Sequence, residues 1–243
     1  MQEEFSRTEL LFGPEAMETL QNARVAVFGV GGVGGYVVEA LARSGVGTLD
    51  LIDKDTVSRS NVNRQIIATQ DTIGRSKVEV AKERVLSINP EAVVHTYQSF
   101  FLPETADQFD FDAFDYVVDA IDTVSGKIAL VTACHEHGTP ILCSMGAGNK
   151  MDPTAFQVTD LAKTSMDPIA RILRKELRKR GIRHVKVVYS TEPALTPRTP
   201  EHEAPDPGRR SVPGSNAFVP SVVGLIIGGE VLKDLTGFKP PQP

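Results

Sequence analysis

The chain has only two cysteines in 243 residues, Cys134 and Cys143, and they are not spaced as C-x-x-C. A disulfide framework needs more cysteines, and structural zinc sites commonly use paired C-x-x-C motifs, so the sequence predicts neither. We therefore expect a reduced, cytoplasmic compartment and no zinc. Because Cys134 falls in a predicted helix and Cys143 ends a predicted strand, we expect both to be core thiols and not nucleophiles.

Long apolar runs and a strong charge of either sign are also missing. No run could cross a bilayer, and the first 13 residues carry acids where a secretory signal would be basic, so we expect no membrane span. With 26 basic and 31 acidic residues the net charge is −5, so any nucleic-acid surface must be local. The motif G-x-x-x-x-G-K-[ST] is absent, which excludes a P-loop protein.

A glycine-rich turn is the strongest signal that is present. The β-branched run 25–28 predicts a strand, and an apolar-periodic helix follows the turn. The turn has glycines at 29, 31, 32, 34 and 35, and Gly29, Gly31 and Gly34 fit G-x-G-x-x-G. Gly32, between them, is also assigned to the nucleotide site. A second predicted strand, 48–52, ends at Asp53, nineteen residues after Gly34, where an acid can bind ribose hydroxyls. The turn alone is compatible with NAD, FAD, S-adenosylmethionine or ATP.

Helices and strands alternate after this turn. Further strands are predicted at 93–97, 116–118 and 140–143, with helices at 77–88 and 127–137. Such β-α-β alternation predicts an α/β fold with a doubly wound, mainly parallel, Rossmann-like sheet. We assign residues 1–150 to a nucleotide-binding domain.

The last third, residues 151–243, is predicted to be a C-terminal α+β extension packed on the same sheet. Strands are expected at 155–158 and 186–189 and helices at 168–179 and 221–235. Residues 193–216 are rich in proline and charge, which predicts a mobile loop. Close packing against another backbone would explain three glycines in the final helix: Gly224, Gly228 and Gly229.

Polar side chains after the predicted strands indicate the ligand, because strand carboxyl ends border the crevice in such sheets. Asn61, Arg64 and Lys77 would neutralise a polyphosphate, and NAD needs fewer charges there, so we favour ATP. Asp122 suits Mg²⁺, which proteins hold with one or two carboxylates plus phosphate oxygens. Its neighbour Asp119 is interpreted as structural, although the two roles could be exchanged.

Six motifs in order resemble the adenylating domain of the ubiquitin-activating, molybdopterin- and thiamine-pathway adenylyltransferases: FSR, GVGGVGG, DKD, NVNRQ, G-x-x-K and DAID. That family uses ATP with Mg²⁺ to adenylate a carboxylate and release pyrophosphate. The resemblance implies that Asp53 binds the ribose and that Asp122 binds the metal. It also implies that Asn61, Arg64 and Lys77 bind the phosphates. Two further residues of the matched motifs are expected in the nucleotide site: Asp55 and Gln65.

The FSR motif contains Arg7, which matches an arginine that enters the neighbouring subunit's site in the family. The resemblance therefore implies a homodimer. Such an arginine would stabilise the charge that develops on the α-phosphate during attack. The residues expected to act directly in catalysis are Arg7, Arg64, Lys77 and Asp122.

Three C-terminal segments resemble one branch of this family, which cyclises N6-threonylcarbamoyladenosine beside the anticodon of tRNA. They are GAGNKMDPTAFQVTDLAKTSMDPIA, VYSTEPA and SNAFVPSVVGLIIGGEVL. The resemblance implies adenylation of the threonyl carboxylate, then ring closure by a nitrogen of the same substituent with release of AMP. No covalent enzyme intermediate is required. Because the paired C-x-x-C motifs of many carrier-activating members are absent, the sequence argues against that branch.

A basic segment offers a surface for tRNA. Residues 171–186 contain eight Lys or Arg and one acid in an otherwise acidic chain. We predict that tRNA phosphates contact six of them: Arg171, Arg174, Lys175, Arg178, Lys179 and Arg183. Arg209 and Arg210 could assist. The alternative for this segment is an ordinary solvated amphipathic helix.

Three other functions remain open at this stage. An adenylyltransferase acting on the C-terminal glycine of a small sulfur-carrier protein would use the same chemistry. An NAD-dependent oxidoreductase would suit the glycines and Asp53, but it would leave Arg64, Lys77 and Asp122 without a role. A nucleotide sensor would bind ATP without turnover.

Overall fold

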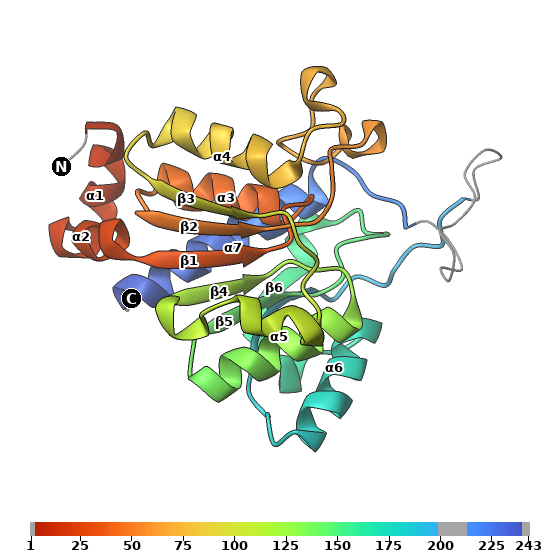
Figure 1. The fold of residues 1–243 in the computed structure, drawn as a ribbon. Helices are drawn as coiled ribbons and strands as arrows, with labels where there is room; N and C mark the ends of the chain where they lie inside the picture. The colour runs from red at the N-terminus through yellow and green to blue at the C-terminus, as the bar shows by residue number, and fades with distance from the viewer. Residues whose placement is uncertain (1–2, 199–212, 240–243) are drawn as a thin grey trace.

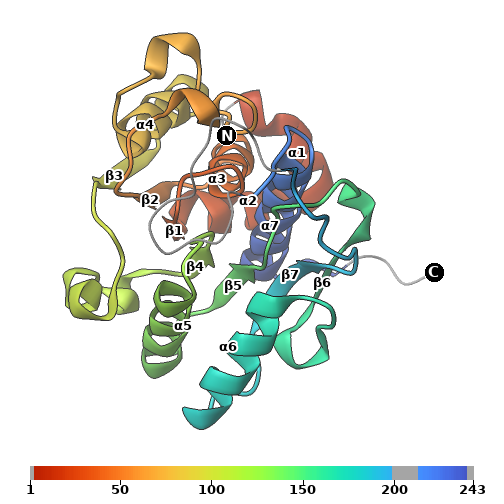
Figure 2. The same ribbon diagram turned by 90° about the vertical axis from the view of Figure 1, so that its right-hand side faces the viewer.

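The computed structural model describes residues 3–198 and 213–239. In this part of the chain one seven-stranded sheet has the order β3-β2-β1-β4-β5-β7-β6 (Figures 1 and 2). Neighbouring strands are parallel except β6 and β7. The predicted doubly wound, mainly parallel sheet is confirmed. The strands are β1 (Arg24–Phe28), β2 (Thr48–Ile52), β3 (Val93–Tyr97), β4 (Tyr116–Asp119), β5 (Ile141–Ser144), β6 (Phe156–Asp160) and β7 (Lys186–Ser190).

Helices cover both faces of the sheet (Figure 1). On one face lie α3, α4 and α7, and on the other lie α5 and α6. The short helices α1 and α2 lie beyond the amino ends of the strands. The helices are α1 (Ser6–Phe12), α2 (Pro14–Asn22), α3 (Gly34–Arg43), α4 (Lys77–Ile88), α5 (Val124–His137), α6 (Pro168–Lys179) and α7 (Val219–Thr236).

Strand β1 shows why the central strands are apolar on both faces. Val25 and Val27 belong to the core under α3 and α7, whereas Ala26 and Phe28 belong to the core under α5. All four side chains are fully buried. Alternate residues of a strand point to opposite faces, so a sheet covered on both sides needs continuous apolar strands. Polar residues are therefore found at the ends of the central strands.

The last third of the chain extends the same sheet, because β7 lies between β5 and β6. Helix α7 then returns to pack on α3. A Cβ at Gly224 would lie 2.4 Å from the Val33 carbonyl oxygen, and one at Gly228 would lie 2.6 Å from Ala40 Cβ. These two glycines therefore allow the predicted close approach. The expectation for Gly229 was wrong, because no atom of the described residues lies within 4 Å of a Cβ built there.

Part of the predicted mobile loop 193–216, including Arg209 and Arg210, lies outside the described residues. Across residues 3–198 and 213–239, no helix combines the length and apolarity required to cross a bilayer. Figure 2 looks onto the carboxyl ends of the strands, where the polar residues predicted for the site are gathered.

Candidate active site

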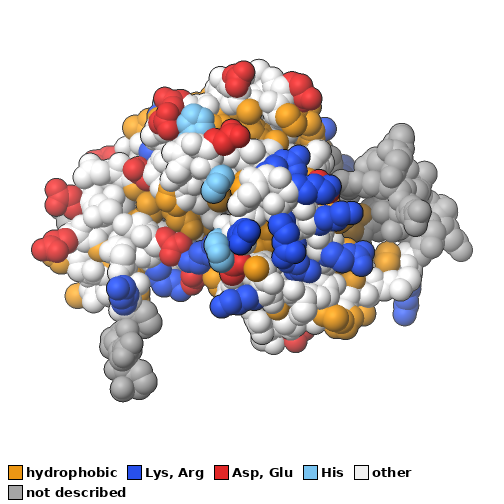
Figure 3. Space-filling view, turned by 90° about the horizontal axis from the view of Figure 1, so that it is seen from below, with side chains coloured by type: hydrophobic (Ala, Val, Ile, Leu, Met, Phe, Trp, Pro, Cys, Tyr) orange, Lys and Arg blue, Asp and Glu red, His pale blue; other side chains and the backbone are white. Residues whose placement is uncertain are grey.

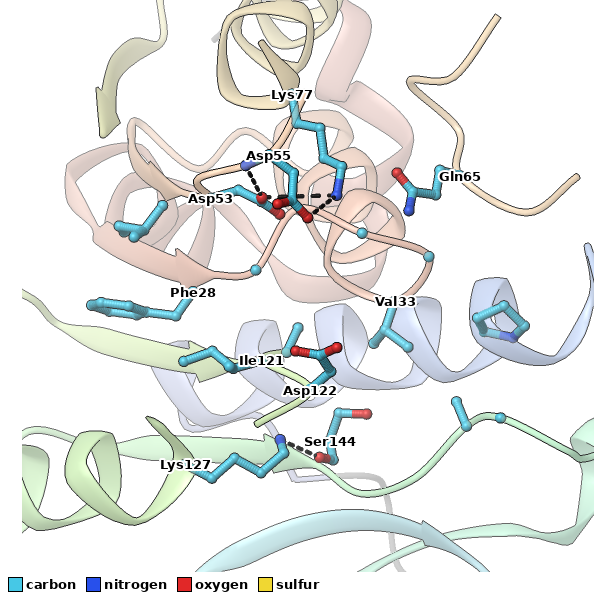
Figure 4. A pocket seen from close by; sticks show the side chains of 18 of the residues that line it. Phe28, Val33, Asp53, Asp55, Gln65, Lys77, Ile121, Asp122, Lys127 and Ser144 are labelled. Atoms are coloured by element: carbon cyan, nitrogen blue, oxygen red, sulfur yellow. Dashed lines mark hydrogen bonds and ion pairs between the residues drawn. The ribbon is translucent and has the colours of Figure 1, made fainter. Parts of the chain in front are cut away.

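A pocket of about 430 Å³ opens at the carboxyl edge of the sheet. Its walls come from the glycine turn after β1 and from the residues that follow β2, β3, β4 and β5 (Figure 4). All but one of the predicted nucleotide-site residues line it: Gly29, Gly31, Gly32, Asp53, Asp55, Asn61, Arg64, Gln65 and Lys77. Asp122 lines it from the opposite wall. The exception is Gly34, which acts in packing.

Two glycines fix the shape of the turn. Gly29 has φ of +93°, and a Cβ there would lie 2.6 Å from the Ala120 carbonyl oxygen. A Cβ at Gly34 would lie 1.7 Å from the Gly29 carbonyl oxygen, so α3 can begin there only with glycine. Tight turning and close helix packing are the roles glycines have in dinucleotide-binding turns. At Gly31 a Cβ would meet nothing nearer than Gln65 Nε2 at 3.8 Å, which leaves the pocket side open.

Asp53 anchors this turn at the end of β2. Its carboxylate accepts hydrogen bonds from the Val30 N–H at 2.8 Å and the Asp55 N–H at 2.9 Å. Lys77, at the start of α4, lies against both acids, with Nζ 3.0 Å from Asp55 Oδ2 and 3.8 Å from Asp53 Oδ1 (Figure 4). The lysine side chain is 7% exposed. A nearly buried ammonium group therefore stands beside the glycine turn.

Arg64 supplies a second cation on the same side of the pocket. Its Nη1 donates to the Ser60 carbonyl at 2.8 Å and to Asn63 Oδ1 at 2.9 Å. Burial lowers the pKa of its guanidinium below the ordinary value, and no carboxylate among residues 3–198 and 213–239 counters this effect. A partly desolvated cation of this kind is stabilised when an anion binds beside it.

Two neighbours of Arg64 complete this wall. Asn61 Oδ1 accepts a hydrogen bond from the Ser58 N–H at 3.0 Å, which holds the short helix Arg59–Asn61 in place. Gln65 is buried, and its Oε1 atom has no hydrogen-bond partner in the part of the chain that the structure describes. Buried polar atoms are normally paired, so this oxygen indicates a ligand or water in the pocket.

Asp119 and Asp122 differ sharply in their surroundings. Asp122 is exposed and lines the pocket just beyond the end of β4 (Figure 4). Asp119 is fully buried, and its Oδ1 accepts hydrogen bonds from Lys127 Nζ at 3.0 Å and the Ile121 N–H at 3.1 Å. Lys127 Nζ also donates to the Ser144 carbonyl at 2.7 Å. Asp119 thus ties the end of β4 to the end of β5.

Sequence reasoning missed Lys127. It is 2% exposed and lines the floor of the pocket from α5 (Figure 4). A signal existed: a lone lysine in an apolar helix just after two carboxylates needs a buried counter-charge.

The chemistry of the pocket fits Mg²⁺. A hard cation requires oxygen ligands, and Asp122 presents an exposed carboxylate in the pocket that the two cations also line. Asp119, by contrast, is fully buried, and its carboxylate is held by Lys127 and the Ile121 N–H. Asp122 is therefore the residue suited to hold the ion.

Arg7 is not part of this pocket. It is exposed on α1, beyond the amino ends of the strands, whereas the pocket lies at their carboxyl ends (Figure 1). The structure does not bring Arg7 together with the other predicted catalytic residues of the same chain.

Basic side chains gather on the face that carries α6 (Figure 3). The exposed members of the predicted set are Arg171, Lys175, Arg178, Lys179 and Arg183. Lys179 pairs with Glu176 at 2.7 Å. Arg174 differs, because it is half-buried and its guanidinium donates to Thr164, to the carbonyl oxygen at 2.8 Å and to Oγ1. This contact holds the loop before α6 and leaves Arg174 less available to a ligand.

Helix α6 begins at the pocket. Its N-cap residue Asp167 accepts hydrogen bonds from the Ala170 N–H at 2.8 Å and the Gly146 N–H at 3.2 Å. Ile169 and Gly146 line the pocket. The basic surface therefore starts beside the wall after β5.

Neither cysteine is suited to nucleophilic chemistry. Cys134 and Cys143 are fully buried, and burial raises the pKa of both thiols well above the ordinary value. A thiol is nucleophilic as the thiolate, so these groups stay inert at neutral pH.

Fold and pocket define the class: a doubly wound α/β protein with a nucleotide-type crevice at the strand carboxyl ends. The chain belongs to the ThiF family, whose model matches residues 5–243.

Its similarity to known proteins is illustrated by three of them. The tRNA threonylcarbamoyladenosine dehydratase of Bacillus subtilis is 48% identical over 242 residues, which covers 97% of this chain and 95% of that protein. The solved structure of the Escherichia coli tRNA N6-threonylcarbamoyladenosine dehydratase in complex with ATP is 37% identical, with a TM-score of 0.86 over 96% of this chain and 94% of that one. The molybdopterin-synthase adenylyltransferase of Salmonella typhimurium is 35% identical over 164 residues, covering 68% of this chain and 64% of that protein.

Proposed function

We propose that this protein uses ATP to cyclise N6-threonylcarbamoyladenosine in tRNA, next to the anticodon, by dehydration. The observation that carries the proposal is a pocket lined by two cations, the nearly buried Lys77 and the half-buried Arg64, together with the exposed carboxylate of Asp122. A polyphosphate needs such a set, whereas NAD would leave it unused. Similarity over nearly the full chain to a protein named for this reaction supports the same substrate.

Residues from the two walls of the pocket bind different parts of ATP. Asp53 binds the ribose hydroxyls, and the open side of the glycine turn admits the phosphates. Lys77 and Arg64 neutralise the phosphate oxygens, and Asn61 and Gln65 add polar contacts from the same wall. Asp122 holds Mg²⁺, which when bound neutralises charge on the phosphates and the leaving pyrophosphate.

The chemical steps balance without an enzyme nucleophile. An oxygen of the threonyl carboxylate attacks the α-phosphorus of ATP, and the bond to pyrophosphate breaks, which gives an acyl-adenylate. A nitrogen of the same substituent then attacks the acyl carbon and expels AMP, which carries away that carboxylate oxygen. Because nucleophile and electrophile belong to one molecule, orientation in the pocket supplies much of the rate.

Mass spectrometry of tRNA nucleosides tests this function. After incubation with ATP and Mg²⁺, tRNA that carries N6-threonylcarbamoyladenosine should lose the mass of one water at that nucleoside. Omission of ATP is the control. An unchanged nucleoside, together with pyrophosphate exchange that requires a small carrier protein, would favour the sulfur-carrier alternative.

A tRNA substrate and buried, unpaired cysteines support a cytoplasmic location.

We also propose that the enzyme is a homodimer in which Arg7 completes the pocket of the partner subunit. The exposed position of Arg7 at the far end of the sheet supports a role outside its own chain's pocket. Arg7→Ala and Asp122→Asn should each be nearly inactive. Co-expressed in equal amounts, they should regain about a quarter of the wild-type activity, because half of the dimers are mixed and each has one intact site. No recovery in isolated mixed dimers would place Arg7 in its own site or outside catalysis.

The exposed basic residues of α6 and the turn after it are proposed to bind tRNA. Lys175→Glu, Arg178→Glu and Arg183→Glu together should weaken tRNA binding at least about tenfold and lower the slope of log K against log salt by about 2–3 units. ATP affinity, which depends on the pocket, should not change. Filter binding across a salt series measures the slope, and an unaltered slope would reject this surface.

A further inference from the structure

Residues 213–216, which lead into α7, lie between two walls of the pocket. Ser215 lines the pocket itself. Asn63 Nδ2 donates a hydrogen bond to the Ser215 carbonyl at 3.0 Å. The other end of the same carboxamide, Asn63 Oδ1, accepts a hydrogen bond from Arg64 Nη1 at 2.9 Å. One planar group therefore links this segment to a cation assigned to the phosphates.

The opposite side of the segment is held by the loop after β5, where Gly146, Ala147 and Gly148 line the pocket. The next residue, Asn149, forms a reciprocal pair with Gly214. The Asn149 N–H donates to the Gly214 carbonyl at 2.8 Å, and Asn149 Oδ1 accepts from the Gly214 N–H at 2.6 Å. Asn216 Nδ2 adds a bond to the Lys150 carbonyl at 2.9 Å.

The backbone of Asn149 is adapted to this contact. Its φ is +58°, in the left-handed region that asparagine tolerates better than most residues other than glycine. Such conformations persist where surrounding contacts hold them. Hydrogen bonds thus connect Asn149 to Gly214, and Ser215 to Asn63 and Arg64, and the peptide bond between Gly214 and Ser215 completes the path.

We propose that Asn63 is a positioning residue that couples substrate binding beside the loop after β5 to ATP binding at Arg64; this inference rests on the proposed function. Substrate packed against residues 146–149 orders residues 213–216. Through Asn63, this ordering holds the Arg64 guanidinium where a phosphate oxygen needs it. Coupling between two sites is reciprocal, so ATP bound at Arg64 equally favours the substrate.

Binding of a non-hydrolysable ATP analogue, measured with and without tRNA that carries N6-threonylcarbamoyladenosine, tests the coupling. In the wild type the tRNA should tighten analogue binding about fivefold or more, the lower end of usual coupling between sites. Asn63→Ala should reduce this ratio to between about one and two, because both hydrogen bonds are lost. Asn63→Gln, which keeps both groups, should restore part of it. Asn22→Ala is the matched control, since Asn22 is exposed on α2 and its side chain donates to the Glu18 carbonyl in its own helix.

A wild-type ratio in Asn63→Ala, or a ratio near one in the wild type, would overturn the inference. If Asn63→Ala does not fold, Asn149→Gly replaces it, because glycine accepts the positive φ and removes only the side-chain bond to Gly214. That variant must also lower the ratio. Failure of the proposed function would look different, because the wild type would then bind no ATP analogue or leave the nucleoside unconverted.

Discussion

Asp122→Asn should reduce the rate of cyclisation at least about 100-fold, the scale observed when one group that stabilises a transition-state charge is removed. Asp122 lines the same pocket as Arg64 and Lys77, and its carboxylate is the one suited to Mg²⁺. Asparagine keeps the size of the side chain but loses the charge that attracts the cation. Single-turnover conversion of tRNA at saturating ATP and Mg²⁺ measures the loss.

Protein stability separates this effect from misfolding. Because Asp122 is exposed, the substitution should change the free energy of unfolding by no more than about 0.5 kcal/mol. Asp71→Asn is a matched control, since Asp71 is exposed and does not line the pocket. Wild-type turnover in Asp122→Asn would refute the role given to this carboxylate.

Lys127→Met should lower the free energy of unfolding by about 3–5 kcal/mol, the usual cost of leaving one partner of a buried ion pair unpaired. The Asp119 carboxylate is fully buried, and Lys127 is the cation that compensates it. Methionine fills a similar volume, so lost charge and not lost packing would dominate. Chemical denaturation followed by circular dichroism measures the change.

The double variant Asp119→Leu/Lys127→Met isolates the electrostatic cause. Replacing both members of a buried pair by apolar residues is often neutral, so the double variant should be clearly more stable than Lys127→Met alone. Recovery should be incomplete, because the Ile121 N–H also donates to Asp119. A single variant as stable as the wild type, or a double variant no better than the single one, would contradict this account.

The sequence predicts the architecture well where periodicity is strong. The strand 48–52 and the helices 77–88 and 168–179 have the predicted bounds, since apolar spacing and breakers mark both ends. Helix α5 begins at Val124, earlier than the expected 127, because its first turn carries few apolar residues that would signal a helix. The position of β7 between β5 and β6 was not predictable, because local sequence does not encode strand order.

The nucleotide half of the pocket was predictable because its residues sit in short motifs that fix their spacing. The opposite half was not. Lys127 and Asn63 act through partners distant in sequence, Ser144 for the first and Ser215 for the second. In the sequence Arg174 cannot be distinguished from the basic residues around it. Its contact with Thr164 in the structure is what shows its different role. Such roles depend on tertiary contacts.

The fate of one oxygen atom tests the central claim most directly. When tRNA carries ¹⁸O in the threonyl carboxylate, attack on the α-phosphorus of ATP followed by ring closure must transfer one labelled oxygen to AMP. We expect AMP heavier by the mass difference of one ¹⁸O, in equal amount to the cyclised nucleoside. Unlabelled AMP, or label in inorganic phosphate with ADP as the nucleotide product, would contradict the account.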